Sequence, residues 1–440
     1  MEAPIERARW WSWRRQRLDR TCRGVEDCLQ SVIGVYSANP HGALSLLARV
    51  PRLLKGAAVE GVISTKRAVR VPAMRRSIFM LPRETAHLAF WATPRSVAPY
   101  RQVLRRAGVG DREWERLRSA ILAATEVPLE PAEIRARLGS PPKDLTPVLH
   151  AMCAEGVLLR IKARTIRSNE ISYCATEAWL GEPLRQVDPT EALVWLAGDY
   201  LTAYGPATPE DFAWWTGVPR KQAAEALASL EPVDVGGGWL MHRRDERAFS
   251  GMRKLSGRVN LLPKWDCYTM GYGPEGRSRF ATPAVQQIIY DAGGNAQPVV
   301  LIEGEVGGTW EHRILGDRIR VKLLLFEQPA PALRDALDSE AALVATFLEA
   351  ARSTIAYERV ERPRARRARA PSKRRPTIKP RRTAAKAAGT RNTSKKTARR
   401  KTTKKKSTKT SARKSAKSGT RTGAKPGARK SPKKPARRPS

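Results

Sequence analysis

The sequence predicts a mainly α-helical protein with an α+β part, in which tandem winged-helix (helix-turn-helix) units precede a small β-barrel-like domain and a disordered basic tail. Three observations support this fold class. Three short helices and a hairpin follow one another between Asp111 and Trp179, the same order starts again at Asp188, and strand-like segments with turn residues follow residue 250. A typical domain holds roughly 100 to 150 residues, so the 360 residues before the tail have room for about two to four compact units.

We place the domain boundaries where these patterns change. The predicted segments are a divergent N-terminal winged-helix unit at 1–108, a second unit at 109–182, a third unit at 183–248, a β-rich barrel-like domain with a closing helix at 249–358, and a disordered Lys/Arg-rich tail at 359–440.

The first 108 residues are the least regular part of the chain. One stretch carries apolar residues at helical spacing and predicts a helix with one buried face. These residues are Val25, Cys28, Leu29, Val32 and Ile33. Residues 70–81 then predict a pair of strands that ends before Pro82.

The second unit is expected to begin with three helices. The first is predicted from Arg112 to Ala124, and the second from Glu130 to Leu138, where Gly139 supplies a stop. The third, from Asp144 to Ala154, has apolar residues at positions i, i+3, i+4 and i+7, so one face is expected to lie in a core. These residues are Leu145, Val148, Leu149 and Met152.

A hairpin is expected to follow the third helix. Residues 157–164 alternate between apolar and basic side chains, as in a strand with one buried face. A turn at residues 168–169 would lead into a return strand near Tyr173. On the outer face of the first strand Arg160, Lys162 and Arg164 present one sign of charge, which favours contact with a polyanion over an ordinary solvated face.

The third unit repeats this order. Asp188 precedes a helix expected to reach Ala203, and Thr208 with Asp211 resembles a capping box at the start of a short second helix. A third helix is expected after Pro219, with Arg220 and Lys221 in its first turn, and residues 233–241 would form a Gly-rich wing.

The segment after residue 250 is predicted to be rich in β-structure. Strands are expected over 260–263, 298–302 and 319–325. A last helix is expected from Ala330 to Ala356, and order should cease near Arg362.

The tail carries most of the charge of the chain. From Glu361 to Ser440 there are 33 Lys and Arg residues against one acidic residue, a net charge of +32 out of a total of +40. With Ile378 as its only large apolar residue, this segment cannot bury enough surface to offset the entropy of ordering. A solubility tail is the alternative, but such tails are usually acidic, whereas dense cations bind nucleic acid at cellular salt.

Several classes of protein are not supported. The five cysteines form no C-x-x-C pair and the histidines are scattered, so neither a disulfide scaffold nor a zinc site is indicated. The chain has no P-loop and no dinucleotide-binding glycine motif, and we expect no cofactor and no metal. It also lacks a signal peptide and an apolar run of about 18 residues. We therefore expect a cytoplasmic protein or a nuclear one, and the family resemblance described below implies a cytoplasmic, nucleoid-associated bacterial protein.

Double-stranded DNA, contacted largely through its phosphates, is the expected partner, with no membrane and no small-molecule cofactor involved. The residues expected to bind DNA are Arg75, Arg76, Lys143, Arg160, Lys162, Arg164, Arg167, Arg220, Lys221, Lys404, Lys405, Lys406, Lys433 and Lys434. The third helix of the second unit offers few long side chains that could read base edges, so strong sequence specificity is not indicated.

Four segments together give the chain a family resemblance. They are residues 70–82 (RVPAMRRSIFMLP), 207–217 (ATPEDFAWWTG), 261–268 (LLPKWDCY) and 306–310 (VGGTW). In this order they resemble winged-helix DNA-binding proteins whose best-known members are bacterial DNA glycosylases of interstrand-crosslink and alkylated-base repair. The resemblance covers the body and not the tail, and it implies three tandem winged-helix units and a β-barrel-like domain around duplex DNA.

The resemblance also points to a catalytic stretch. Catalytic members of the family carry two glutamines, separated by one residue and shortly before a proline, that position the hydrolytic water. Here residues 34–40 read GVYSANP, which places Tyr36 and Ala38 at the two glutamine positions. Alanine cannot polarise water, so the candidate catalytic residues are Tyr36, Asn39 and Asp266, the last two as acceptors that could orient water or stabilise positive charge. Asn39 can equally form a turn with Pro40, and Asp266 can cap or brace a loop.

Two functions of different class remain open. One is a DNA-repair glycosylase or a damage-recognising relative, tethered to DNA by its tail. The other is a non-catalytic nucleoid-architectural or transcription-regulatory DNA-binding protein.

Three aromatic residues, Trp265, Tyr268 and Trp310, are either stacking partners for a base or parts of the core.

Overall fold

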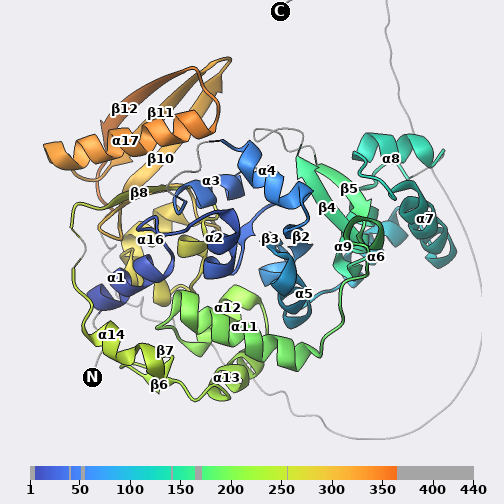
Figure 1. Cartoon of the computed structure of the whole chain (residues 1–440), viewed down its shortest axis with the longest axis horizontal. Helices are drawn as coiled ribbons and strands as arrows, with labels where there is room; N and C mark the ends of the chain where they lie inside the picture. Colours follow the sequence, from blue (N-terminus) through green and yellow to red (C-terminus); the bar gives the residue numbers. More distant parts are fainter. Residues whose placement is uncertain are drawn as a thin grey trace, which may run out of the picture. The chain divides into compact units, whose positions relative to one another are not determined.

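The structure, a computed structural model, describes residues 5–38, 41–50, 55–139, 142–163, 171–254 and 256–363. These residues form a mixed α/β fold that contains a five-stranded sheet near their C-terminal end (Figure 1). Nearly all of the predicted tail, from residue 364 onward, lies outside the described residues.

Helices surround a small three-stranded sheet in the N-terminal part. The helices are α1 (Ile5–Arg15), α2 (Val25–Val32), α3 (His41–Leu47), α4 (Ala57–Ser64) and α5 (Arg83–Ala92), and the strands are β1 (Val35–Tyr36), β2 (Ala68–Pro72) and β3 (Ile78–Pro82). The expected apolar stripe on α2 is buried, and the expected strand pair is the antiparallel pair β2–β3. The sheet order is β1-β3-β2, with Tyr36 opposite Phe79.

The second part holds the three predicted helices and the hairpin. Its elements are α6 (Ala98–Arg106), α7 (Asp111–Ala124), α8 (Pro131–Arg137), α9 (Thr146–Glu155), β4 (Leu158–Ala163), β5 (Ile171–Ala175) and α10 (Thr176–Leu180). The predicted stripe of the third helix is fully buried, and Gly156 ends that helix at a φ of 79°. This part has a hydrophobic cluster of its own, to which α7 contributes Trp114, Leu117 and Ile121.

The third part repeats the order with a smaller hairpin. Its elements are α11 (Pro189–Tyr204), α12 (Pro209–Thr216), α13 (Arg220–Ala228), β6 (Val233–Asp234) and β7 (Leu240–Met241). The predicted capping box is present, since the Thr208 side chain accepts from the Asp211 backbone N–H at 3.1 Å and the Asp211 carboxylate accepts from the Thr208 N–H at 3.2 Å. Asp188 caps α11 through its side chain, which accepts from the backbone N–H groups of Thr190 and Glu191.

The C-terminal part contains the large sheet. Its elements are the 3₁₀ turns η2 (Arg243–Asp245) and η3 (Gly276–Arg279), the helices α14 (Glu246–Ser250), α15 (Cys267–Met270), α16 (Pro283–Ile289) and α17 (Pro331–Phe347), and the strands β8 (Val259–Leu262), β9 (Val299–Ile302), β10 (Glu305–Leu315), β11 (Arg318–Leu325) and β12 (Arg352–Arg359). The strand order is β12-β11-β10-β9-β8, antiparallel except for the parallel pair β11–β12.

Two expectations for this part need correction. The sheet is open rather than closed into a barrel, because α17 packs against β8, β11 and β12 and buries Leu337, Val344 and Phe347 there. The last helix also ends at Phe347, well before Ala356. Residues 352–359 form β12 instead, since a parallel neighbour of β11 needs a helical crossover and α17 supplies it.

One hydrophobic core joins the first, third and C-terminal parts and also includes Leu159, Ile161 and Cys174 of the β4–β5 hairpin. It contains Val32 and Met80 from the first, Tyr200 from the third, and Leu262 and Phe347 from the last. These parts therefore support one another and do not form separate cores. No helix in the described part of the chain combines the length and the apolar composition that a bilayer crossing requires.

Candidate nucleic-acid site

Tyr36 lies at the end of β1, where two pockets meet. Its half-buried ring packs against Trp265, with centroids 4.8 Å apart, and meets Phe79 edge-on at 6.4 Å. Burial raises the pKa of the Tyr36 hydroxyl, although nearby Arg160 acts in the opposite direction. The first predicted glutamine position thus holds a neutral aromatic ring that lines both pockets.

The pocket on one side of Tyr36 is mostly apolar, and we call it the aromatic pocket. It has a volume of about 370 Å³ and is lined by Tyr36, Met74, Arg75, Ser77, Phe79, Trp215, Trp265, Cys267, Met270 and Asn295. Small-molecule sites typically combine aromatic walls with a few polar groups in a volume of this order. A planar heterocycle such as a nucleobase matches this lining.

The pocket on the other side is basic, and we call it the arginine pocket. It has a volume of about 240 Å³ and is lined by Tyr36, Ala38, Pro72, Arg76, Ser77, Ile78, Pro94, Arg95, Ser96, Tyr100, His150, Cys153, Ala154 and Arg160. These lining residues include three arginines and a histidine but neither Asp nor Glu. The second predicted glutamine position, Ala38, lies in this pocket and offers no polar side chain.

The turn between β2 and β3 sends one arginine to each pocket. Arg75 and Arg76 are consecutive residues with positive φ, 53° and 61°, and the turn is closed by the Ala73 N–H, which donates to the Ser77 carbonyl at 2.9 Å. A residue other than glycine in this region costs roughly 1–2 kcal/mol. With this backbone conformation the two side chains point in different directions, and Arg75 lines the aromatic pocket while Arg76 lines the arginine pocket.

Arg75 is held by an indole ring that it shares with a second arginine. The guanidinium carbons of Arg75 and Arg277 lie 4.1 and 4.5 Å from the centroid of the Trp214 ring. Arg75 also donates to the Gly293 carbonyl at 3.1 Å. Burial lowers the pKa of both arginines, and the charge of Arg277 lowers that of Arg75 further. Among the described residues neither guanidinium has a carboxylate within ion-pair distance.

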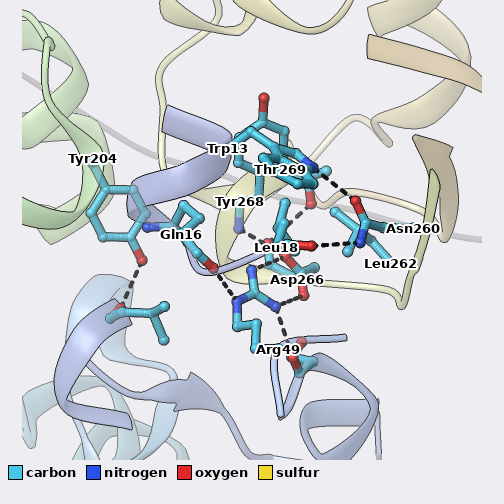
Figure 2. A network of polar contacts seen from close by, with 12 residues as sticks. Trp13, Gln16, Leu18, Arg49, Tyr204, Asn260, Leu262, Asp266, Tyr268 and Thr269 are labelled. Atoms are coloured by element: carbon cyan, nitrogen blue, oxygen red, sulfur yellow. Dashed lines mark hydrogen bonds and ion pairs between the residues drawn. The ribbon is translucent and has the colours of Figure 1, made fainter. Parts of the chain in front are cut away.

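Asp266 lies beside the aromatic pocket but does not line it. Its carboxylate accepts two hydrogen bonds from the Arg49 guanidinium, both 2.8 Å long, and a third from the Tyr268 N–H that caps α15 (Figure 2). Both side chains are fully buried. Burial by itself would lower the pKa of Arg49, but the surrounding groups, first among them the Asp266 carboxylate, act in the opposite direction and raise that pKa well above its usual value.

Arg49 extends this network into the N-terminal part. It donates to the Gln16 carbonyl at 2.9 Å (Figure 2). It also donates to the Ser45 carbonyl at 2.8 Å. Trp13 donates to Asn260 at 2.8 Å, close by. The network therefore ties α1 and α3 to the loop that carries Trp265, and this geometry favours the bracing role for Asp266 that the sequence left open.

The structure brings four of the predicted site residues together, namely Tyr36, Arg75, Arg76 and Arg160. Lys143, Arg220 and Lys221 are exposed elsewhere on the surface, and Lys221 pairs with Glu225 at 3.8 Å. Lys162 belongs to β4, but its side chain is not described. The predicted residues outside the described part of the chain are Asn39, Arg164, Arg167, Lys404, Lys405, Lys406, Lys433 and Lys434.

The three aromatic candidates divide between the two alternatives. Tyr268 is fully buried, and Trp310 is buried with its indole N–H donating to the Leu262 carbonyl at 2.7 Å, so both are core residues. Trp265 is half-buried and lines the aromatic pocket. Sequence reasoning missed Arg95 and Arg277, because neither stands in a basic strand or in a helix stripe.

Comparison with known proteins gives a consistent result. A family model described as "DNA glycosylase AlkZ-like" matches residues 29–347. An "Interstrand DNA cross-link repair glycosylase" of Streptomyces sahachiroi is 30% identical over 155 residues, which are 33% of this chain and 41% of that protein, so the match spans about two fifths of the relative's length. The solved structure of the DNA glycosylase AlkZ of Streptomyces sahachiroi is similar with a TM-score of 0.63 at 21% identity, covering 81% of this chain and all of that one, which shows a shared fold.

Proposed function

Because this chain belongs to the AlkZ-like DNA glycosylase family, we propose that it binds duplex DNA and recognises a damaged nucleotide at the site around Tyr36. The observation that carries this proposal is the pairing of the two pockets. The aromatic pocket has the size and lining to accept a base, and the arginine pocket beside it has the charge to accept the backbone.

The proposed DNA-binding framework is a set of tandem winged-helix units. The order α7, α8, α9, β4, β5 and the order α11, α12, α13, β6, β7 support two of them, and α2 to α5 with β2–β3 support a divergent first unit. In such units one helix enters the major groove and the hairpin contacts the backbone. Basic side chains of these elements, such as Lys143 and Arg220, would add phosphate contacts.

We propose damage recognition, and not hydrolysis by a glutamine pair, as the function of this site. At the two positions in question the chain has Tyr36, whose ring can stack on a base, and Ala38, which cannot orient water. Asp266 is fully occupied by Arg49. A glycosylase would need a different water-positioning group, for which Asn39 is the remaining candidate of the three.

The tail is proposed to tether the protein to DNA. Its Lys and Arg residues, with few acids to offset them, would release counterions from the duplex without reading its sequence. This contribution would raise the local concentration of the body on DNA, in keeping with association with the nucleoid.

The proposal is tested with duplexes that carry one abasic-site analogue or one N-alkylated purine, compared with the undamaged duplex. We expect the full chain to retard all of them, to bind the damaged duplexes several-fold more tightly, and to lose this preference in Tyr36→Ala. The undamaged duplex measures binding by the rest of the protein. Equal affinity for damaged and undamaged DNA in the wild type would instead support an architectural protein.

Alkaline cleavage of the same alkylated duplexes reports on hydrolysis. A damage-recognition protein leaves the N-glycosidic bond intact, so no strand break should appear above the background of the duplex alone. Strand breaks that depend on the protein would establish a glycosylase, and their persistence in Tyr36→Ala would place the water-positioning group elsewhere.

A further inference from the structure

The arginine pocket collects positive charge, and the described residues that line it include no carboxylate. The pocket lies between the first part of the chain and the elements α6, α9 and β4 of the second part, and Arg70 links β2 to β4. Arg70 donates to Ser37 at 2.8 Å and to the Ile161 carbonyl, and its charge is balanced by Glu60 at 2.8 Å. Arg95 and Arg160 have no such carboxylate among the described residues, although both line the same pocket.

The guanidinium groups in this pocket also have unused hydrogen-bond donors. The Nε atoms of Arg95 and Arg160 are buried and have no hydrogen-bond partner in the described structure. The guanidinium of Arg95 is held in place by aromatic rings, at 3.8 Å from the Trp91 centroid and 4.4 Å from that of Phe90. A buried N–H without an acceptor is costly, and a guanidinium cannot lose its charge to avoid that cost.

Burial lowers the pKa values of two ionisable groups of this pocket, and neighbouring charge adds to the effect at one of them. Burial lowers the pKa of Arg95. Burial and then the charge of Arg160 lower the pKa of His150, so the imidazole on the pocket wall is held in its neutral form. An anion that enters the pocket would meet the guanidinium groups of Arg95 and Arg160 and the more exposed Arg76.

We infer that the arginine pocket binds one phosphate group of the DNA backbone, next to the nucleotide whose base lies in the aromatic pocket, with Arg95 and Arg160 as the main donors. This inference rests on the proposed function. Guanidinium groups recognise phosphate through paired N–H···O bonds. The volume of about 240 Å³ suits a phosphate and part of a sugar, since pockets for drug-sized ligands start at roughly 300 Å³. Tyr36 lines both pockets and would separate the base from its phosphate.

The test compares full-length variants that each lose one positive charge. Arg95→Gln and Arg160→Gln remove pocket donors, whereas Arg116→Gln removes an exposed arginine of α7 that pairs with Glu113 at 2.7 Å. Hydrogen bonds to charged groups are worth roughly 1.5–3 kcal/mol, which corresponds to a loss of duplex affinity of about 10- to 100-fold for each pocket variant. Arg116→Gln should change affinity by about twofold or less.

Two further variants separate phosphate binding from a structural role. Arg160→Lys keeps the positive charge but loses the paired N–H donors of the guanidinium. It should therefore recover part of the duplex affinity that Arg160→Gln loses. The double variant Arg95→Gln/Arg160→Gln should lose less than the product of the single losses, because both arginines act on the same phosphate. Thermal melting of each variant checks folding, and a variant that melts early is replaced by Arg95→Lys in the same series.

Binding of inorganic phosphate shows whether the pocket accepts a phosphate of the DNA backbone or a small phosphate compound. Millimolar phosphate should raise the melting temperature of the wild type more than that of Arg160→Gln, while Arg116→Gln responds as the wild type does. If Arg160→Gln loses this response but binds duplex as well as Arg116→Gln, the pocket serves a small phosphate compound and the inference is wrong. It is also wrong if the pocket variants behave as Arg116→Gln in both assays. Failure of the wild type itself to bind duplex would overturn the proposed function as well.

Discussion

Tyr36 occupies a position where the catalytic members of the family have a glutamine, and the two side chains support different chemistry. An amide at this place could orient a water molecule, but a phenol ring packed 4.8 Å from Trp265 offers a stacking surface, and burial raises its pKa so that it stays neutral. At the second glutamine position, two residues further along, Ala38 has no polar side chain that could orient water. These two positions are the reason for our proposal that this stretch holds a base and does not hydrolyse its bond.

Asp266 gives the first prediction at the scale of single residues. Removing one partner of a buried ion pair leaves the other charge uncompensated, which costs about 3–5 kcal/mol. We expect Asp266→Ala to lower the free energy of unfolding by about this amount, because Arg49 would lose two hydrogen bonds in a fully buried place. Urea denaturation followed by fluorescence measures the change.

The matched control for Asp266→Ala is the double variant Arg49→Met/Asp266→Leu. It removes both charges and retains most of the volume, so it should recover much of the lost stability. If Asp266→Ala proves as stable as the wild type, the buried pair does not brace the Trp265 loop, and a role in the chemistry becomes the better interpretation.

Asp199 on α11 gives a prediction about pH. Burial raises its pKa from 3.8 to about 6, with Arg244 acting in the opposite direction. Between these values the folded protein holds more protons than the unfolded chain, so the contribution of Asp199 to stability falls as the pH rises from about 4 to 6. We expect Asp199→Asn to be about 1–2 kcal/mol more stable than the wild type at pH 7, a value reduced for partial exposure.

The advantage of Asp199→Asn should shrink toward pH 4, and denaturation midpoints across this range measure it. Asp335→Asn, at an exposed position on α17, is the control and should show a difference that does not vary in this way. A constant difference between Asp199→Asn and the wild type from pH 4 to pH 8 would contradict the raised pKa.

At the scale of elements, helix α12 connects its own cap to the site. Its capping box joins Thr208 and Asp211, and the Asp211 carboxylate also accepts from the Gly273 N–H at 2.8 Å. The helix packs against the turn that carries Arg75, and its Trp215 lines the aromatic pocket. The cap therefore helps to fix one wall of the site.

We expect Thr208→Ala to lower stability by about 1 kcal/mol, the usual cost of losing an N-cap side chain. Hydrogen exchange should show faster exchange of the first amides of α12, including that of Asp211, which donates to Thr208 at 3.1 Å. Thr208→Ser retains the acceptor and should exchange like the wild type. Unchanged protection in Thr208→Ala would mean that packing alone holds the helix start.

Elements with local signals could be predicted from the sequence, and elements set by distant pairing could not. The start of α12 follows from Thr208, Pro209 and Asp211, and the stripe on α9 from apolar spacing, because a helix forms its hydrogen bonds within its own segment. The segment of β12 was expected to continue a helix, because its own residues give no clear strand signal. It becomes a strand only through its parallel pairing with β11, which lies on the other side of α17 in the sequence. Whether the sheet stays open or closes into a barrel also depends on the pairing of distant segments, so it could not be predicted from local patterns either.

At the scale of the whole molecule, the site forms where separate parts of the chain meet. The arginine pocket takes Arg76 from the β2–β3 turn, Arg95 from the segment after α5, and Arg160 from β4. Each was visible in the sequence as one basic residue among many, and no local pattern indicates that three of them share one cavity. The basic character of the protein could thus be predicted from composition, but the pocket required the fold.

The tail gives the last prediction. After residue 363 the sequence carries 32 Lys and Arg residues and no acidic residue, so its removal takes away most of the net charge. If the tail neutralises about ten phosphates, deleting it should weaken binding to undamaged duplex and reduce the slope of log affinity against log salt by about nine. The preference for a damaged duplex should persist, because the described site lies within residues 36–295. Filter binding or anisotropy from 50 to 300 mM salt measures both quantities. An unchanged slope would mean that the tail does not contact DNA, whereas a lost preference would place part of the recognition site in the tail.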